Sequence, residues 1–324
     1  MNDYKKNRFR YILLLILFSF YSTSCIKMWL GTPEIGSKSF PIEFYIENTN
    51  YTKDENTISH LQKCIEDKTG FHLKFTYVPD EKAVLAALTR GSAHYGLTSA
   101  LSYVGAATKS SLKSVLLLTK KGQATNRAVI VGKTDYWKNK LQKSKQINHL
   151  SNSNYENILS LENNLTIAYS EPESIVGFLL PRMYLLQKKI FPNAAIFTGS
   201  FPAVLDALNE NLATIGVISE TFFDSKFPNF SPIQIGSQFN DFIILSTSPS
   251  LPSNTIIESS GITPFASQSI VNGITDCAQK NSTEFKKIFD ADGVIKSNDK
   301  FFGFTKELYH FQQENIRILT QRSN

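Results

Sequence analysis

The segment from Ala168 to Pro181 holds residues whose types and spacing could bind a ligand. A strand ends there, Pro172 makes a turn, Ser174 can cap a helix, and Gly177 lets another group approach its backbone closely. Free N–H groups in the first turn of a helix, together with the helix dipole, attract an anion. The same pattern also fits an ordinary capped helix, whose N–H groups two nearby glutamates could satisfy.

Motifs of covalent chemistry are missing from the sequence. It contains no GxSxG elbow, no phosphate-binding P-loop and no GxGxxG fingerprint. The five histidines are scattered, no CxxC or HExxH spacing occurs, and the segment Asp290–Gly293 has the composition of a plain turn. We therefore predict a binding protein and not an enzyme, with no catalytic residue, no cofactor and no metal.

Length and composition are those of a globular protein with room for two domains. The chain has 324 residues, of which 42% are hydrophobic and 19% charged, which excludes a disordered chain and a polytopic membrane protein. Half of the net charge of +6 lies in residues 1–24, and basic residues are not interleaved with aromatic ones along one element. These features exclude nucleic acid as the expected partner.

The N-terminus has the order of an export signal. Four basic residues precede the apolar run Tyr11–Phe18, and small residues stand directly before Cys25. The run is shorter than a membrane-spanning helix, so we predict a signal peptide over 1–24 in place of an uncleaved anchor. The end of this leader resembles a bacterial lipobox, although Ser22 stands where that pattern prefers leucine. The resemblance implies lipidation at Cys25, a membrane anchor and a periplasmic or other extracytoplasmic location, with simple secretion as the alternative.

Two features follow from an exported location. Residues 25–39 show no clean periodicity and are interpreted as a tether. The remaining cysteines, Cys64 and Cys277, could form one disulfide in an oxidising compartment, but their pairing cannot be deduced from the sequence.

Short apolar runs alternate with helical periods along the rest of the chain, which predicts α/β units with mostly parallel sheets. Such units could form two domains in series, or two lobes in which the last segment returns to the first. Strands are predicted at 42–46, 72–78, 95–98, 128–132, 165–169, 195–197, 214–218 and 242–245, and helices at 57–69, 81–89, 101–107, 174–188 and 203–209, with a chiefly helical end over 264–320.

The segment Glu171–Pro181 resembles a family motif of an acid, Pro, any residue, Ser-Thr-Ser-Gly and a later Pro. That motif marks the substrate-binding proteins of phosphonate, phosphite and phosphate ABC transporters. The similarity extends through Leu61–Gly70, Gly91–Tyr103 and Thr198–Val204 and covers most of the exported chain. It also includes smaller matches near the C-terminus, at Leu251-Pro252, Asp292-Gly293, Phe301-Phe302 and Tyr309.

The resemblance implies a type II periplasmic binding protein fold, with two α/β lobes joined by two crossover hinges. Residues 40–120 and 237–324 would form lobe 1, and residues 121–236 lobe 2. The implied function is an exported solute-binding protein that holds a small molecule between its lobes and delivers it to ABC permease subunits.

Several positions depart from the family's ligand motif. Ser174 is retained and Gly177 follows it, but Ile175 and Val176 replace two hydroxyl residues, and Phe201 stands where the family has His. Most of the side chains with which the family binds a phosphonate are therefore missing.

Other implied ligand contacts change charge. Glu81 and Asn126 stand where the family has tyrosines, Asp241 matches an acid that meets the ammonium group in amine-bearing phosphonate binders, and Glu220 lies within a residue of another such acid. These acids favour a zwitterionic, cationic or apolar-aromatic ligand over a bare oxyanion, although each could be a surface charge or a helix cap.

Three alternatives stay open at this point. The chain could be a ligand-sensing lipoprotein without transport, or an enzyme on the same two-lobed fold, such as a precursor synthase or a transferase. It could also be a degenerate binding protein with a structural or adhesive role.

Overall fold

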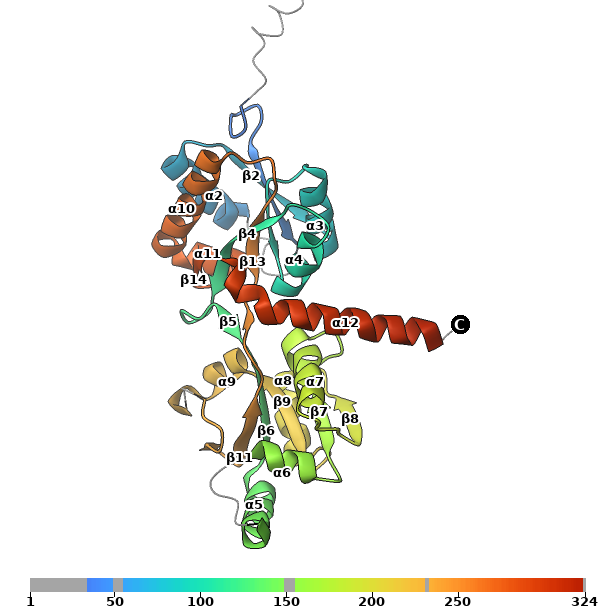
Figure 1. The fold of residues 1–324 in the computed structure, drawn as a ribbon. Helices are drawn as coiled ribbons and strands as arrows, with labels where there is room; N and C mark the ends of the chain where they lie inside the picture. The colour runs from blue at the N-terminus through green and yellow to red at the C-terminus, as the bar shows by residue number, and fades with distance from the viewer. Residues whose placement is uncertain (1–33, 49–54, 149–154, 231–232, 323–324) are drawn as a thin grey trace, which may run out of the picture.

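A computed structural model describes residues 34–48, 55–148, 155–230 and 233–322. Two six-stranded sheets with helices on both faces form two lobes, stacked end to end with chain crossings between them (Figure 1). The predicted two-lobed α/β fold is confirmed. The predicted signal peptide, Cys25 and residues 26–33 lie outside the described residues.

Lobe 1 is built on a sheet with the strand order β14-β4-β13-β3-β1-β2. Helices α2, α10 and α11 cover one face through the core cluster around Phe44 and Leu61, and α3 and α4 cover the other through Val84 and Val104. Its elements are β1 (Ile42–Glu47), α2 (Glu55–Thr69), β2 (Leu73–Val78), α3 (Glu81–Arg90), β3 (Tyr95–Thr98), α4 (Ala100–Ala107), β4 (Lys113–Thr119), β13 (Thr255–Glu258), α10 (Pro264–Lys280), α11 (Ser282–Phe289), β14 (Gly293–Lys296) and the 3-10 helix η3 (Asp299–Phe302).

Lobe 2 repeats this plan with the strand order β10-β11-β6-β9-β7-β8. Helices α5, α6 and α7 supply Trp137, Leu159 and Leu185 to one core cluster, while α8 and α9 supply Val204 and Phe223 to the other. Its elements are β6 (Ala128–Lys133), α5 (Thr134–Asn148), α6 (Tyr155–Leu161), β7 (Thr166–Tyr169), η1 (Ile175–Leu179), α7 (Leu180–Gln187), β8 (Ala194–Phe197), α8 (Phe201–Asn209), β9 (Ile215–Ser219), α9 (Glu220–Lys226), η2 (Pro228–Phe230), β10 (Gln238–Phe239) and β11 (Phe242–Thr247).

Both sheets are mixed, whereas the sequence predicted mostly parallel ones. Strands β1, β2 and β3 are parallel, as are β7, β8 and β9, but β13 is antiparallel to β3 and β4, and β6 is antiparallel to β9 and β11. The reason is the crossover. A strand that enters a lobe from the other lobe starts at the sheet edge where the parallel strands end.

The two crossovers pair with each other as the short strands β5 (Thr125–Asn126) and β12 (Leu251–Pro252). We take this pair as the hinge. The sequence predicted that the chain re-enters lobe 1 at residue 237. This boundary is too early, because β10 and β11 belong to the sheet of lobe 2. Strand β11 stays there because its buried run Ile243–Leu245 completes the lobe 2 cores.

The C-terminal helix α12 (Gly303–Arg322) lies across the junction of the lobes (Figure 1). It packs against α4 of lobe 1 and α7 of lobe 2. Its fully buried Leu308 joins the lobe 2 cluster that contains Leu185. The helix therefore bridges both lobes, whereas the sequence assigned it to lobe 1 alone.

Residues 34–40 are ordered against lobe 1, so the predicted tether over 25–39 is wrong for this part. Gly36 donates its N–H to the Phe40 carbonyl at 2.8 Å and accepts from the His72 N–H at 2.7 Å. Gly36 has φ +88°, and a Cβ there would lie 2.4 Å from the Phe71 ring. The turn needs glycine for both reasons.

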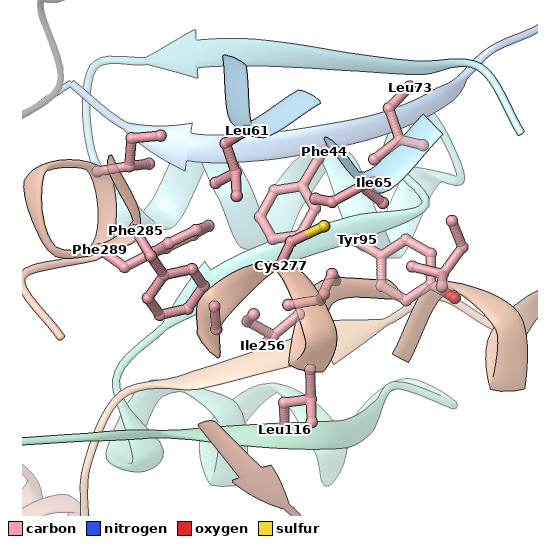
Figure 2. Close-up of a cluster of buried hydrophobic side chains, with 14 of the residues drawn as sticks. Phe44, Leu61, Ile65, Leu73, Tyr95, Leu116, Ile256, Cys277, Phe285 and Phe289 are labelled. Atoms are coloured by element: carbon pink, nitrogen blue, oxygen red, sulfur yellow. The ribbon is translucent and has the colours of Figure 1, made fainter. Parts of the chain in front are cut away.

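A disulfide joins Cys64 of α2 to Cys277 of α10, with the two Cα atoms 6.0 Å apart. Cys277 lies among the buried side chains of the lobe 1 core, beside Leu61, Ile65 and Phe44 (Figure 2). The pairing that the sequence left open is therefore formed. In the described part of the chain, no helix is long and apolar enough to cross a membrane.

Candidate functional site

Three adjoining cavities form a cleft at the junction of the lobes. Both lobes line the first and third cavities, whereas lobe 1 and Asn254 beside the hinge line the second. The first, of about 210 Å³, shares Ser99 and Asn254 with the second, of about 320 Å³. The first also shares Lys120 and Thr221 with the third, of about 710 Å³, and Asp290 lines all three. Both lobes and the hinge contribute to this cleft, so its shape depends on the angle between the lobes.

The first cavity contains three of the predicted ligand residues. Ile175 and Val176 of η1 line it from lobe 2, and Asn126 lines it from the hinge strand β5. Thr305 of α12 is fully buried and lines it too, and its Oγ1 has no hydrogen-bond partner among the described residues. The sequence did not single out Thr305, because nothing in its local pattern distinguishes it from a helix residue on a core face.

Ser174 forms hydrogen bonds with the backbone of its own helix and does not line any of the three cavities. Its Oγ accepts the Gly177 N–H at 2.9 Å, and its carbonyl accepts the N–H groups of Phe178 and Leu179. The i→i+5 bond makes η1 a π turn, a geometry often found at functional sites. The predicted helix start is present, but its hydroxyl caps its own helix.

Gly177 is packed so closely that no side chain fits. A Cβ there would lie 2.0 Å from the Ser170 Oγ and 2.7 Å from the Ser174 Oγ. The Ser170 hydroxyl is buried and has no hydrogen-bond partner among the described residues. Gly177 therefore fixes the position of the η1 turn that carries Ile175 and Val176.

Replacing Gly177 by alanine is expected to destabilise the protein by about 1–3 kcal/mol, because the extra methyl group must displace the buried Ser170 hydroxyl and the Ser174 cap. Denaturant unfolding measures this loss. Gly303→Ala is the control, since a Cβ at Gly303 meets nothing within 4 Å and its φ of −53° suits alanine. An equal effect of the two substitutions would contradict the packing argument.

Phe201 lies in the third cavity and not in the first. It starts α8 behind the cap Ser200, whose Oγ accepts the Ala203 N–H, and its ring lies 5.6 Å from that of Phe222. Lys120 and Lys121 of lobe 1 line the same cavity. The predicted role of Phe201 as a wall of the cleft is compatible with this position.

Glu81 lines the second cavity, where its carboxylate sits at the start of α4. One oxygen accepts the Ser99 N–H, and the other accepts the Ser102 hydroxyl at 2.6 Å. Glu47, at the end of β1, lines the same cavity. Burial raises the pKa of Glu47, and the nearby charges of Glu81 and Asp80 raise it further.

Glu220 is engaged by a residue of the first crossover. Arg127 donates from Nε and Nη2 to the Glu220 Oε1, at 2.9 and 2.7 Å. Asn126 stands beside this pair and holds Thr221 through its side-chain oxygen and nitrogen. Glu220 does not line any of the three cavities. Its pairing with Arg127 could not be predicted, because the two residues are 93 positions apart in the sequence.

Asp241 is not brought to the cleft. It is exposed between β10 and β11, and its carbonyl accepts the Thr134 N–H at the start of α5. In Figure 1, α5 lies at the end of lobe 2 that is farthest from lobe 1. The predicted contact between Asp241 and the ligand is incompatible with this placement.

The structure adds charged residues that the sequence did not single out. Lys120 forms an ion pair with Asp290 at 2.5 Å within lobe 1. Lys121 donates from Nζ to the Asp224 carbonyl at 2.8 Å and so connects the lobes. Both lysines lie in a tight turn directly after β4. Because the sequence did not predict this strand, it could not predict that the two lysines line the cleft.

The lining of the cleft suits the binding of a small solute and not of a metal ion. Within the described ranges, no group of three or more His, Cys, Asp or Glu side chains is placed to hold a metal ion. The first cavity combines apolar walls with neutral polar groups, and its two charged residues, Lys120 and Asp290, neutralise each other. Such a lining suits a small solute with polar and apolar parts.

Solved structures share this fold at low sequence identity. XAC2383 from Xanthomonas citri, bound to ATP, is 15% identical with a TM-score of 0.57 over 84% of this chain and 97% of that one. PhnD1 from Prochlorococcus marinus, in complex with methylphosphonate, is 16% identical with a TM-score of 0.51 over 84% and 99% of the two chains. Mh-p37 from Mycoplasma hyorhinis is 12% identical with a TM-score of 0.57 over 83% and 98%.

The family assignment rests on a sequence model and not on these structures, whose identities establish the fold alone. No curated protein matches the chain. A family model described as "ABC transporter, phosphonate, periplasmic substrate-binding protein" matches residues 48–301, which is most of the chain. The resemblance seen in the sequence is thereby confirmed, and the chain belongs to the family of periplasmic substrate-binding proteins of phosphonate ABC transporters.

Proposed function

We propose that this protein is the solute-binding component of an ABC-type uptake system, which holds a small solute between its lobes and presents it to a permease. The solute is phosphonate- or phosphate-like, or bears an amine. The protein performs no covalent chemistry in this role. It acts outside the cytoplasm, as its family does, and is anchored to a bacterial membrane by a lipid on Cys25.

The observation that carries the proposal is the composition of the first cavity. It is lined by Ile175 and Val176 of lobe 2, Ser99 of lobe 1, and Asn126 and Leu251 of the paired hinge strands. A solute that contacts both lobes stabilises the closed state relative to the open one. The permease would then recognise the closed form.

The contact between the lobes supports this mechanism. Lys121 of lobe 1 donates to the Asp224 carbonyl of lobe 2, and this bond must break when the cleft opens. A single part-buried hydrogen bond contributes about 1 kcal/mol. A bond of this strength favours the closed state only slightly. The equilibrium between the open and closed states therefore depends mainly on the solute.

A solute screen on protein lacking residues 1–25 tests the proposal. We expect phosphate, phosphite, 2-aminoethylphosphonate or a small amine to raise the melting temperature saturably and to reduce the radius of gyration by X-ray scattering. Thr221→Ala should weaken binding about tenfold or more, because it shortens a side chain that lines the first and third cavities and removes the hydroxyl that accepts from the Asn126 amide. Asp241→Asn is the control and should leave binding unchanged. Binding without closure, or no binding of any solute from a small-molecule extract, would refute the proposal.

Lipidation is tested separately, by mass spectrometry of the protein recovered from a bacterial membrane fraction. We expect a mature N-terminus at Cys25 that carries a diacylglyceryl group, and Cys25→Ala should release the protein from the membrane. An unmodified N-terminus downstream of Cys25 would show secretion without an anchor.

A further inference from the structure

We propose that the second cavity is a cation subsite, so that the solute carries an ammonium or guanidinium group that lies against Glu47 and Glu81 of lobe 1. This inference rests on the proposed function and names the chemical class of the solute. It assigns a role to Glu47, which the sequence did not single out.

The charged residues that line this cavity are all acidic. They are Glu47 at the end of β1, Glu81 at the start of α3 and Asp290 directly after α11. Asp290 is already neutralised by Lys120, and Glu81 accepts two hydrogen bonds. Glu47 is half-buried and has no ion pair or hydrogen bond from its side chain to another described residue. A carboxylate that loses water in this way is stabilised by a cation.

The end of a helix adds to the negative potential. Helix α11 ends at this cavity, since its last residues, Ile288 and Phe289, line it together with the cap Asp290. The C-terminus of a helix carries a partial negative charge and favours a cation. Strand β1 also ends here, at the edge of an α/β sheet where ligands bind.

A buried hydroxyl group independently indicates a ligand. Thr98 lines the cavity, is 2% exposed, and its Oγ1 has no hydrogen-bond partner among the described residues. Buried polar groups are nearly always satisfied, so such an oxygen needs a partner from outside the chain. A cationic group carries N–H donors, and both this oxygen and the Glu47 carboxylate could accept hydrogen bonds from them.

The same cavity disfavours an oxyanion. The start of α4 is the place in lobe 1 where a helix dipole would attract a phosphate group. The Glu81 carboxylate occupies it, bonded to the Ser99 N–H and the Ser102 hydroxyl. A second anion there would meet Glu81 and Glu47 without a free cation among the residues that line the cavity.

Calorimetry with matched probes tests the inference on protein lacking residues 1–25. Each ammonium-bearing probe is compared with an isostere that lacks the charge: ethanolamine with ethylene glycol, putrescine with butanediol, and 2-aminoethylphosphonate with 2-hydroxyethylphosphonate. We expect the ammonium member of at least one pair to bind about tenfold or more tightly than its isostere. Glu47→Gln should remove that preference, while Asp67→Asn, an equal charge change on the exposed side of α2, should keep it.

Each other outcome overturns the inference. Isosteres that bind as tightly as the ammonium probes, or a preference that survives Glu47→Gln and Glu81→Gln, would show that these acids do not bind a cation. Binding of phosphate or 2-hydroxyethylphosphonate alone would overturn the cation subsite and leave the proposed function standing. Absence of binding by every probe, and by a small-molecule extract, would reject both.

Discussion

Replacing Arg127 by leucine is expected to cost about 3 kcal/mol of unfolding free energy, because it leaves the Glu220 carboxylate buried without its partner. The Glu220 side chain is only 9% exposed, and both of its bonds come from this one guanidinium group. The Arg127 side chain is 29% exposed, so water can replace part of the hydrogen bonding that its guanidinium group loses when Glu220 is the residue changed. Urea unfolding of the purified protein measures the difference.

A double-mutant cycle separates the ion pair from simple packing. Glu220→Gln should cost less than Arg127→Leu, since the partly exposed guanidinium remains hydrated. The double variant with leucine at both positions should recover much of the stability, because an apolar pair often replaces a buried ion pair without loss. Additive effects of the two single substitutions would contradict a coupled pair.

The pair also positions the cleft. The Arg127 carbonyl accepts the Glu220 N–H, and the adjacent Asn126 side chain holds Thr221, a residue of the first and third cavities. Solute affinity should therefore fall in Arg127→Leu, even where the protein is still folded. In this interpretation Glu220 acts through the hinge and not by direct contact with the solute.

Removing the disulfide between Cys64 and Cys277 is expected to cost about 2–5 kcal/mol, since the bond closes a long loop in the unfolded chain. The two residues are 213 positions apart and join α2 to α10 on one face of lobe 1. The double variant with alanine at both positions is preferred to serine, because Cys277 is fully buried and a hydroxyl there would lack partners.

The measurement is urea unfolding with and without a reductant, on protein lacking residues 1–25 so that Cys25 adds no third thiol. Reductant should weaken the parent protein to the level of the alanine variant and leave that variant unchanged. Hydrogen exchange should rise in α2 and α10 and not in lobe 2. Equal stability in both conditions would show that the bond is not formed in solution. A persistent disulfide is typical of an oxidising compartment and so supports export.

Some strands and helices could be predicted because their pattern is local. The alternation in Ile42–Glu47 and the helical face of α2 follow from residues that are neighbours in sequence. Strands β4, β13 and β14 were not predicted. The run Val115–Leu118 is buried from every side, and a continuous apolar run does not distinguish a strand from a buried helix. The family resemblance supplied the two-lobed topology, which periodicity had left open.

The residues at the cleft show the same division. The sequence by itself determined that a capped helix starts at Ser174 after a strand, and the family resemblance implied that Ile175 and Val176 lie at the ligand. The structure shows that these two residues form a π turn and line the first cavity. Only the tertiary structure decided that Glu220 meets Arg127, that Asp241 lies at the far end of lobe 2, and that Glu47 joins Glu81 in one cavity. The physical reason is that a carboxylate's role depends on the charges and the water around it. Those surroundings are set by chain segments that meet only on folding.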